Sequence, residues 1–174
     1  MGTKLDVTIT YLEQCERPPS KPVAMPRGQI AILRVCKPTV HYYRYLYATV
    51  GDPYHWVSRK RLTDDELKRI ITDENVYIYV LYYEGAPAGF TEIDNRAGTE
   101  VEIKFFGLIP DYVGKGLGRY FLKQSIDLAW QLKPVRVMLE TCTLDHPAAL
   151  PLYQKLGFNV FDKRSGQVEL IDDA

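Results

Sequence analysis

The strongest constraint on the fold of this chain is a change of hydrophobic period near Gly114. Before that glycine, short apolar runs at residues 76–83, 87–93 and 100–108 alternate with turn residues, which predicts a meander of antiparallel strands. After it, apolar residues recur at three- and four-residue spacing over residues 117–132, which predicts an amphipathic helix. A strand that leads through a glycine-rich turn into a helix is therefore the centre of the expected fold.

Weaker patterns predict the remaining elements. Further strands are expected at residues 5–12, 29–36, 135–142, 158–161 and 167–171. Further helices are expected at residues 40–49, after the capping box Thr63-x-x-Glu66, and at residues 149–156. Because strands and helices are mixed, and 174 residues correspond to about one domain, we expect a single mixed α/β domain over residues 1–174.

The composition argues against several classes of protein. Lys and Arg total 22 and Asp and Glu total 22, so the formal net charge is zero, whereas a nucleic-acid partner is normally met by a basic surface. No apolar run approaches the roughly 18 residues of a membrane span. Cys15, Cys36 and Cys142 are widely spaced and odd in number, which indicates neither a disulfide framework nor a metal site. We therefore expect a cytoplasmic protein with no metal, no nucleic-acid partner and no membrane partner.

The segment LIPDYVGKGLGR (residues 108–119) connects the predicted strand to the predicted helix. Backbone N–H groups at a helix start have no intrahelical partner, and the helix dipole adds about half a positive charge there. Glycines without a Cβ allow a phosphate group to approach the main chain, and Lys115 and Arg119 add positive charge. The spacing fits neither a Walker A loop nor the dinucleotide fingerprint. The segment thus predicts a site for another phosphate-bearing ligand, with a plain tight turn as the alternative.

Together with a second segment, this turn resembles the GNAT superfamily of acyl-CoA-dependent N-acyltransferases. The second segment, LYQKLGF (residues 152–158), is the complete Leu-Tyr-x-Lys-x-Gly-Phe signature of that family. In the turn, the family pattern Arg/Gln-x-x-Gly-x-Gly/Ala falls on residues 113–118, with Val113 in place of the first Arg or Gln. The resemblance extends from residue 76 to residue 161. It implies a central mixed, mostly antiparallel sheet flanked by helices on both faces.

The resemblance implies that acetyl-CoA is the cosubstrate. By similarity, the strand before the turn supplies backbone donors to the thioester and the pantetheine arm, and the turn binds the pyrophosphate. The residues expected to contact acetyl-CoA are Phe106, Gly107, Leu108, Ile109, Val113, Gly114, Lys115, Gly116, Leu117, Gly118, Arg119, His146 and Tyr153. His146 stands where the family often has an Asn that contacts the pantetheine arm. Val113 removes one side-chain contact to the pyrophosphate.

The implied reaction is acyl transfer from the CoA thioester to an amine, which must lose a proton while the leaving thiolate gains one. Tyr153 is the candidate acid, with helix packing as the alternative role for its ring. Glu102 is the candidate base, because some family members carry a catalytic Glu in this strand. The alternative is that Glu102 belongs to a solvent-exposed face with Glu100 and Lys104. Glu92, on the neighbouring strand, is the second candidate base.

The acceptor wall is expected in the first helix and the loop that follows it. This region is unusually aromatic, and aromatic faces suit a cation or an apolar acceptor. The expected acceptor-binding residues are Tyr43, Tyr47, Trp56 and Glu92. The alternative is a helix that packs on the sheet through its rings.

The expected function is transfer of an acetyl group to a primary amine of a small molecule or a peptide. A non-catalytic acyl-CoA-binding sensor or scaffold is an alternative. O-acylation or a longer acyl chain is another, and it depends on the space near Phe105 and Phe106. Homodimerisation through the C-terminal strands is compatible with the family resemblance.

Overall fold

The computed structural model describes residues 2–19 and 21–171, and this part of the chain is built around one seven-stranded sheet. The strands are β1 (Lys4–Gln14), β2 (Ile30–Arg34), β3 (Val76–Tyr83), β4 (Ala86–Asp94), β5 (Glu100–Leu108), β6 (Arg136–Cys142) and β7 (Asn159–Glu169). Across the sheet they follow the order β2-β3-β4-β5-β6-β1-β7. β5 and β6 run parallel and the other neighbouring pairs are antiparallel, which confirms the expected mixed, mostly antiparallel sheet.

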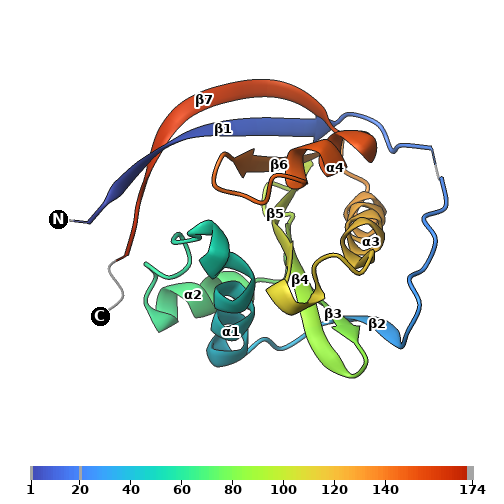
Figure 1. The fold of residues 1–174 in the computed structure, drawn as a ribbon, viewed down its shortest axis with the longest axis horizontal. Coiled ribbons are helices and arrows are strands. Elements are labelled where there is room, and N and C mark those ends of the chain that lie inside the picture. The colour runs from blue at the N-terminus through green and yellow to red at the C-terminus, as the bar shows by residue number, and fades with distance from the viewer. Residues whose placement is uncertain (1, 20, 172–174) are drawn as a thin grey trace.

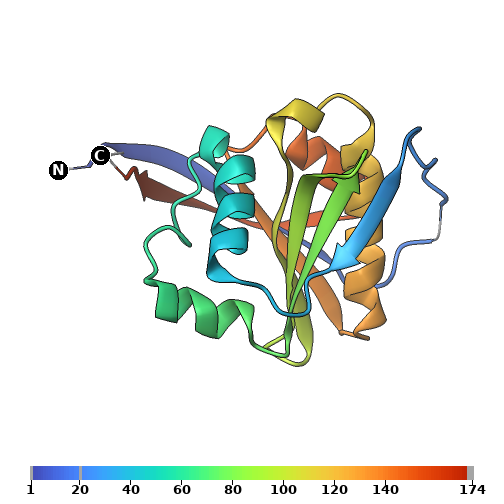
Figure 2. The same cartoon turned by 90° about the horizontal axis from the view of Figure 1, so that it is seen from below.

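Helices cover both faces of the sheet, as expected (Figures 1 and 2). On one face, α1 (Val40–Gly51) and α2 (Asp64–Ile71) bury Tyr43, Leu46 and Leu67 against β3 and β4. On the other face, α3 (Leu117–Gln131) and α4 (Ala149–Lys155) pack against β5, β6 and β1. Two short 3-10 helices, η1 (Asp52–Tyr54) and η2 (Pro110–Tyr112), complete the fold. Among the described residues, no helix has the length and apolar character that crossing a membrane requires.

Local sequence accounts for where three of these helices begin. The hydroxyl of Thr39 accepts from the backbone N–H of Tyr42 at the start of α1. Thr63 and Glu66 form the expected capping box at the start of α2. Gly116 caps α3 with φ 77° and ψ 3°, a left-handed conformation that favours glycine. The change of period predicted near Gly114 therefore becomes a helix that starts at Leu117.

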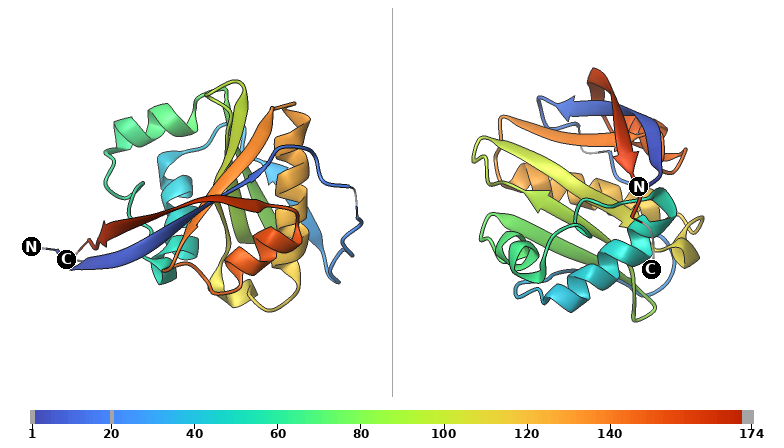
Figure 3. Two further views of the ribbon diagram at one scale, coloured as in Figure 1. Left: turned by 90° about the horizontal axis from the view of Figure 1, so that it is seen from above. Right: turned by 90° about the vertical axis from the view of Figure 1, so that its left-hand side faces the viewer.

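The prediction of two strands at residues 158–161 and 167–171 is wrong, because a single strand, β7, runs without a break over residues 159–169. Residues 162–166 (DKRSG) have the composition of a turn. They nevertheless pair with β1 in a ladder that runs from Lys4 opposite Glu169 to Glu13 opposite Asn159, with one register shift. The hydrogen bonds of this ladder override the local preference. As a result, β1 and β7 form a long arm that extends beyond the rest of the protein (Figure 3).

The parallel pair β5–β6 determines where a ligand can enter the sheet. The two strands are paired only between residues 100–102 of β5 and residues 136–138 of β6. Beyond that point both strands continue with no ladder between them. β5 also has a register shift against β4, where Lys104 is the extra residue of a β-bulge. The sheet therefore opens into a gap between the C-terminal parts of β5 and β6.

Candidate active site

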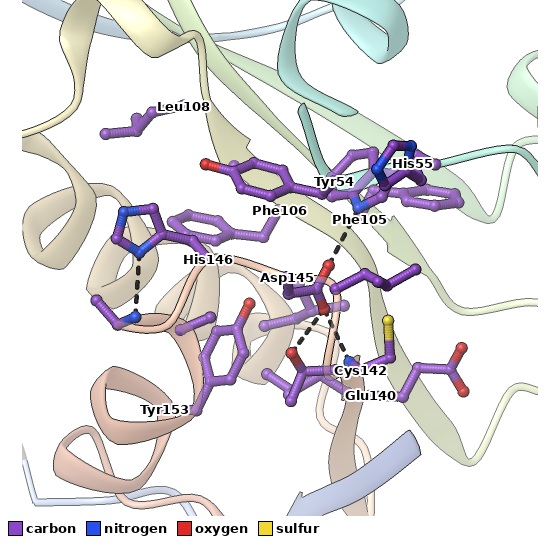
Figure 4. A pocket seen from close by; sticks show the side chains of 18 of the residues that line it. Tyr54, His55, Phe105, Phe106, Leu108, Glu140, Cys142, Asp145, His146 and Tyr153 are labelled. Carbon is purple, nitrogen blue, oxygen red and sulfur yellow. Dashed lines mark hydrogen bonds between the residues drawn. The ribbon is translucent and has the colours of Figure 1, made fainter. Parts of the chain in front are cut away.

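A cavity of about 480 Å³ occupies the gap between β5 and β6 (Figure 4). Its walls come from the second half of β5, the glycine turn, β6 with the loop that follows it, and α4. The segment at residues 54–58, after α1, and the β1–β7 arm close the remaining sides. The cavity thus runs from the glycine turn at one end to the arm at the other.

At the end of the cavity formed by the glycine turn, the main chain is not covered by side chains. Gly114 and Gly116 have φ values of 85° and 77°, and a Cβ built on either glycine would have no neighbour within 4 Å. Both glycines line the cavity, together with Val113 and Gly118. An anion can therefore approach the start of α3 without meeting a side chain.

Three other residues of this turn lie outside the cavity lining. Lys115 and Arg119 are exposed at the surface. Leu117, the first residue of α3, is fully buried because it begins the apolar stripe that packs this helix on the sheet.

The backbone of β5 offers hydrogen-bonding groups to the gap. Ile109 is buried outside the lining, and its N–H donates to the carbonyl of Ala88, at an N···O distance of 2.8 Å. Because alternate residues of a strand direct their backbone groups to opposite sides, those of Phe106 and Leu108 point toward β6, where no ladder is present. Gly107 also lines the cavity, but its backbone groups point toward β4.

Tyr153 and His146 both line the cavity. Figure 4 shows the Tyr153 hydroxyl pointing into the pocket from α4. Burial, and secondarily the charge of Asp145, raise the pKa of Tyr153 well above its ordinary value, so the hydroxyl stays protonated at neutral pH. Nδ1 of His146 accepts from the backbone N–H of Ala148 at 3.0 Å, so a neutral His146 ring carries its proton on Nε2 and can donate it.

Asp145, which is not among the residues predicted from the sequence, connects the two sides of the cavity. One carboxylate oxygen accepts from the Thr141 hydroxyl at 2.6 Å and from the backbone N–H of Cys142 at 2.9 Å. The other accepts from the indole N–H of Trp56 at 3.3 Å. Asp145 therefore holds the loop after β6 against the segment after α1.

Glu140, on β6, is a second carboxylate of the cavity lining that was not predicted from the sequence. Although the residue is exposed at the edge of the cavity, partial desolvation of its carboxyl raises its pKa; the charge of Lys104 opposes this shift, and those of Glu102 and Asp145 reinforce it. A carboxylate with a raised pKa in a cavity is a candidate general base. A charged residue in the middle of the apolar strand before LYQKLGF was the signal available in the sequence. Among the described residues, no group of three His, Cys, Asp or Glu side chains is arranged to hold a metal ion.

Glu102 lies outside the cavity. Its carboxylate is 3.3 Å from Nζ of Lys104 and borders a separate small hollow beside Asp94, Arg96 and Met138. Glu102 occupies the last position at which β5 is still paired with β6, so the gap has not yet opened there.

The four expected acceptor-binding residues divide into two pairs. Tyr47 and Trp56 line the cavity. Tyr43 and Glu92 do not, because both are buried in the core between α1 and the sheet. Glu92 is fully buried, accepts a hydrogen bond from Tyr43 and forms an ion pair with Arg59. This pairing holds the Glu92 carboxylate inside the protein, away from any acceptor.

Comparison with known proteins identifies the family. Residues 41–158 match the model of the Acetyltransferase (GNAT) family. The chain belongs to the GNAT acetyltransferase family. It is also similar to the N-alpha-acetyltransferase RimI of Mycobacterium tuberculosis, with 37% identity over 71 residues. That match spans 41% of this chain and 42% of the relative, so less than half of the relative is covered.

Solved structures with the GNAT fold match more of the chain. A putative GNAT acetyltransferase from Novosphingobium aromaticivorans has a TM-score of 0.62 at 16% identity, covering 92% of this chain and 63% of that one. An aminoglycoside acetyltransferase from an uncultured soil sample has a TM-score of 0.59 at 13% identity, covering 74% of this chain and 87% of that one. These likenesses show that the chain has the GNAT fold.

Proposed function

We propose that this GNAT protein transfers an acetyl group from acetyl-CoA to a primary amine. The observation that carries the proposal is that one cavity joins an open glycine turn, unpaired strand backbone, a protonated tyrosine and a carboxylate with a raised pKa. Acetyl-CoA supplies the activated acyl group. The similarity to a protein named as an N-alpha-acetyltransferase supports an amine as the acceptor.

The residues along the cavity fit an elongated anionic donor. Gly114 and Gly116 would receive the pyrophosphate at the start of α3. The backbone groups of Phe106 and Leu108 would bind the arm that leads inward, and Nε2 of His146 adds a donor on the opposite side. These contacts would direct the acyl end toward the centre of the cavity.

Two side chains then move protons. Glu140 accepts a proton from the incoming ammonium, which has no lone pair for attack until it is deprotonated. Tyr153 donates its proton to the departing thiolate. Figure 4 shows Tyr153 and Glu140 on opposite sides of the pocket, so in this proposal they serve different reacting groups. We therefore propose Glu140 as the base in place of Glu102.

The experiment that tests the function is a calorimetric titration with acetyl-CoA, followed by an assay of CoA release with primary amines. We expect acetyl-CoA to bind with a micromolar Kd or tighter, ATP and NAD not to bind, and CoA to be released when an amine is added. Binding without release for any amine would favour the acyl-CoA-binding sensor. Absence of binding would contradict the donor assignment.

Replacing Gly116 with Asp is expected to weaken acetyl-CoA binding by about tenfold or more, which is about 1.4 kcal/mol or more. The new carboxylate would stand at the helix start and repel the pyrophosphate. Gly98→Asp is the matched control, since Gly98 has a similar φ of 80° and an equally open surrounding, but lies in the β4–β5 turn. Equal affinities of the two variants, measured by calorimetry, would contradict the phosphate site.

Replacing Tyr153 with Phe is expected to lower kcat by about 10²-fold, the lower end of the range for acid–base catalysis. The ring and its packing against Phe158 would be retained, so the Kd for acetyl-CoA should change little. Steady-state kinetics and calorimetry check both values. Equal losses in kcat and in affinity would assign Tyr153 a binding role instead of an acid role.

A further inference from the structure

The end of the cavity away from the glycine turn has two apolar walls. One wall is aliphatic and comes from the arm, where Val7, Ile9 and Val168 line the cavity. The other wall is aromatic and consists of Tyr47, Trp56 and Phe105. The acceptor must enter here, because the donor occupies the opposite end in the proposed function.

Strand register gathers the aliphatic side chains beside Glu140. Ile9 is paired with Cys142, and Tyr11 with Glu140, so alternation places Ile9, Val7 and Glu140 on one face of the sheet. On the other face of the arm, the Gln167 amide donates to the Asp6 carboxylate at 2.7 Å, although Gln167 also reaches the cavity lining. Asp162 and Arg164 share the face of Ile9 and Tyr11, but neither lines the cavity. The arm therefore contributes three aliphatic side chains and one amide to the cavity lining.

The aromatic wall is closely packed and held from behind. The ring of Phe105 lies 5.1 Å from that of Tyr47 and 5.2 Å from that of Trp56, between centroids. The Tyr47 hydroxyl is 3.1 Å from the Ser58 hydroxyl, and the Arg59 guanidinium lies 5.3 Å from the Phe105 centroid. These contacts make the wall a fixed surface.

Few charged groups face this end. The Lys104 ammonium is paired with Glu102, and both oxygens of Asp145 already accept hydrogen bonds. Within residues 2–19 and 21–171, the Glu140 carboxylate has neither a hydrogen-bond donor nor an ion-pair partner. Glu140 is an exposed residue at the edge of the cavity, so its carboxylate can meet one ammonium whose carbon skeleton lies between the apolar walls.

We propose that the acceptor is a primary amine whose substituent next to the amino group is apolar. This inference rests on the proposed function and narrows it. The ammonium would meet Glu140, and the hydrocarbon would lie between the arm and the aromatic wall. A second charge on the substituent would be buried without a partner, which is unfavourable. Each methylene that enters the cavity should raise kcat/KM by about fourfold.

The test compares acceptors of equal size with the full chain and acetyl-CoA. Hexylamine and 1,5-diaminopentane have the same number of heavy atoms, and we expect kcat/KM to be at least about tenfold higher for hexylamine. Tripeptides that begin with Leu or with Asp repeat the comparison for a peptide amine. If hexylamine reacts faster than the Leu peptide, the acceptor is a small molecule; if the Leu peptide reacts faster, the acceptor is a peptide. If the diamine reacts as fast as hexylamine and the Asp peptide as fast as the Leu peptide, the apolar-acceptor inference is overturned, while the proposed acetyl transfer stands. No CoA release with any amine would overturn the proposed function as well.

Val168→Asp tests the wall itself. The added carboxylate should lower kcat/KM for hexylamine by about tenfold or more and bring the diamine closer to it or above it. The Kd for acetyl-CoA should stay unchanged, since Val168 is at the other end of the cavity. Ser165→Asp is the matched control, because Ser165 is exposed and pairs with Thr8 on the opposite face of the same arm. An unchanged ratio of the two amines in Val168→Asp would overturn the inference.

Discussion

Replacing Glu140 with Gln is expected to lower kcat by about 10²–10⁴-fold and to remove the acidic limb of the pH–rate profile. Glu140 accepts a proton only when it is ionised, so the rate of the unaltered protein should rise with pH through the pKa of this carboxyl. Because burial and neighbouring carboxylates raise that pKa, the limb should lie above the ordinary range of a glutamate. Gln has the same shape but cannot take the proton.

Glu102→Gln is the matched control for this prediction. Glu102 lies outside the cavity, so kcat at the optimum should remain close to that of the unaltered protein. Its negative charge helps to raise the pKa of Glu140, so its removal should move the acidic limb to lower pH. A large loss of kcat in Glu102→Gln with a small loss in Glu140→Gln would identify Glu102 as the base.

Replacing Glu92 with Gln is expected to lower the free energy of unfolding by about 3–5 kcal/mol. Glu92 is 0% exposed and Arg59 is 8% exposed, and the two side chains form an ion pair in the core. Neutralising Glu92 leaves the Arg59 guanidinium buried without its counter-charge. Urea unfolding followed by circular dichroism measures the loss.

Asp162→Asn provides the comparison for Glu92→Gln. Asp162 pairs with Arg164 on β7, where the two side chains are 36% and 67% exposed. Exposed pairs contribute about 0–1 kcal/mol, so this variant should remain nearly as stable as the unaltered protein. Similar small losses in both variants would show that the Glu92–Arg59 pair does not stabilise the core.

The Glu92 variant also bears on the aromatic wall of the cavity. Arg59 packs on Phe105, and its backbone N–H donates to the Tyr47 hydroxyl at 3.3 Å. Glu92 therefore supports the acceptor end from behind while remaining outside it. The sequence predicts direct contact between Glu92 and the acceptor, but the structure places this residue one layer deeper.

Much of the site could be predicted from the sequence because its parts are local. The glycine turn, with the helix it starts, depends on residues that are neighbours in the chain. Tyr153 belongs to a contiguous signature, and the α4 stripe around it follows from helical spacing. The meander and the order of the later strands likewise follow from period and turn residues.

The tertiary structure alone decided which carboxylate enters the cavity. Glu102 and Glu140 both lie in central strands, and no local pattern distinguishes them. The difference arises because β5 and β6 separate after residues 102 and 138, so that Glu140 lies beyond the point of separation and Glu102 does not. The continuous β7, and the arm it forms with β1, also depend on pairing between opposite ends of the chain. Periodicity determines which residues share a strand face, but the long-range register of strand pairing determines whether that face contacts the core, the cavity or solvent.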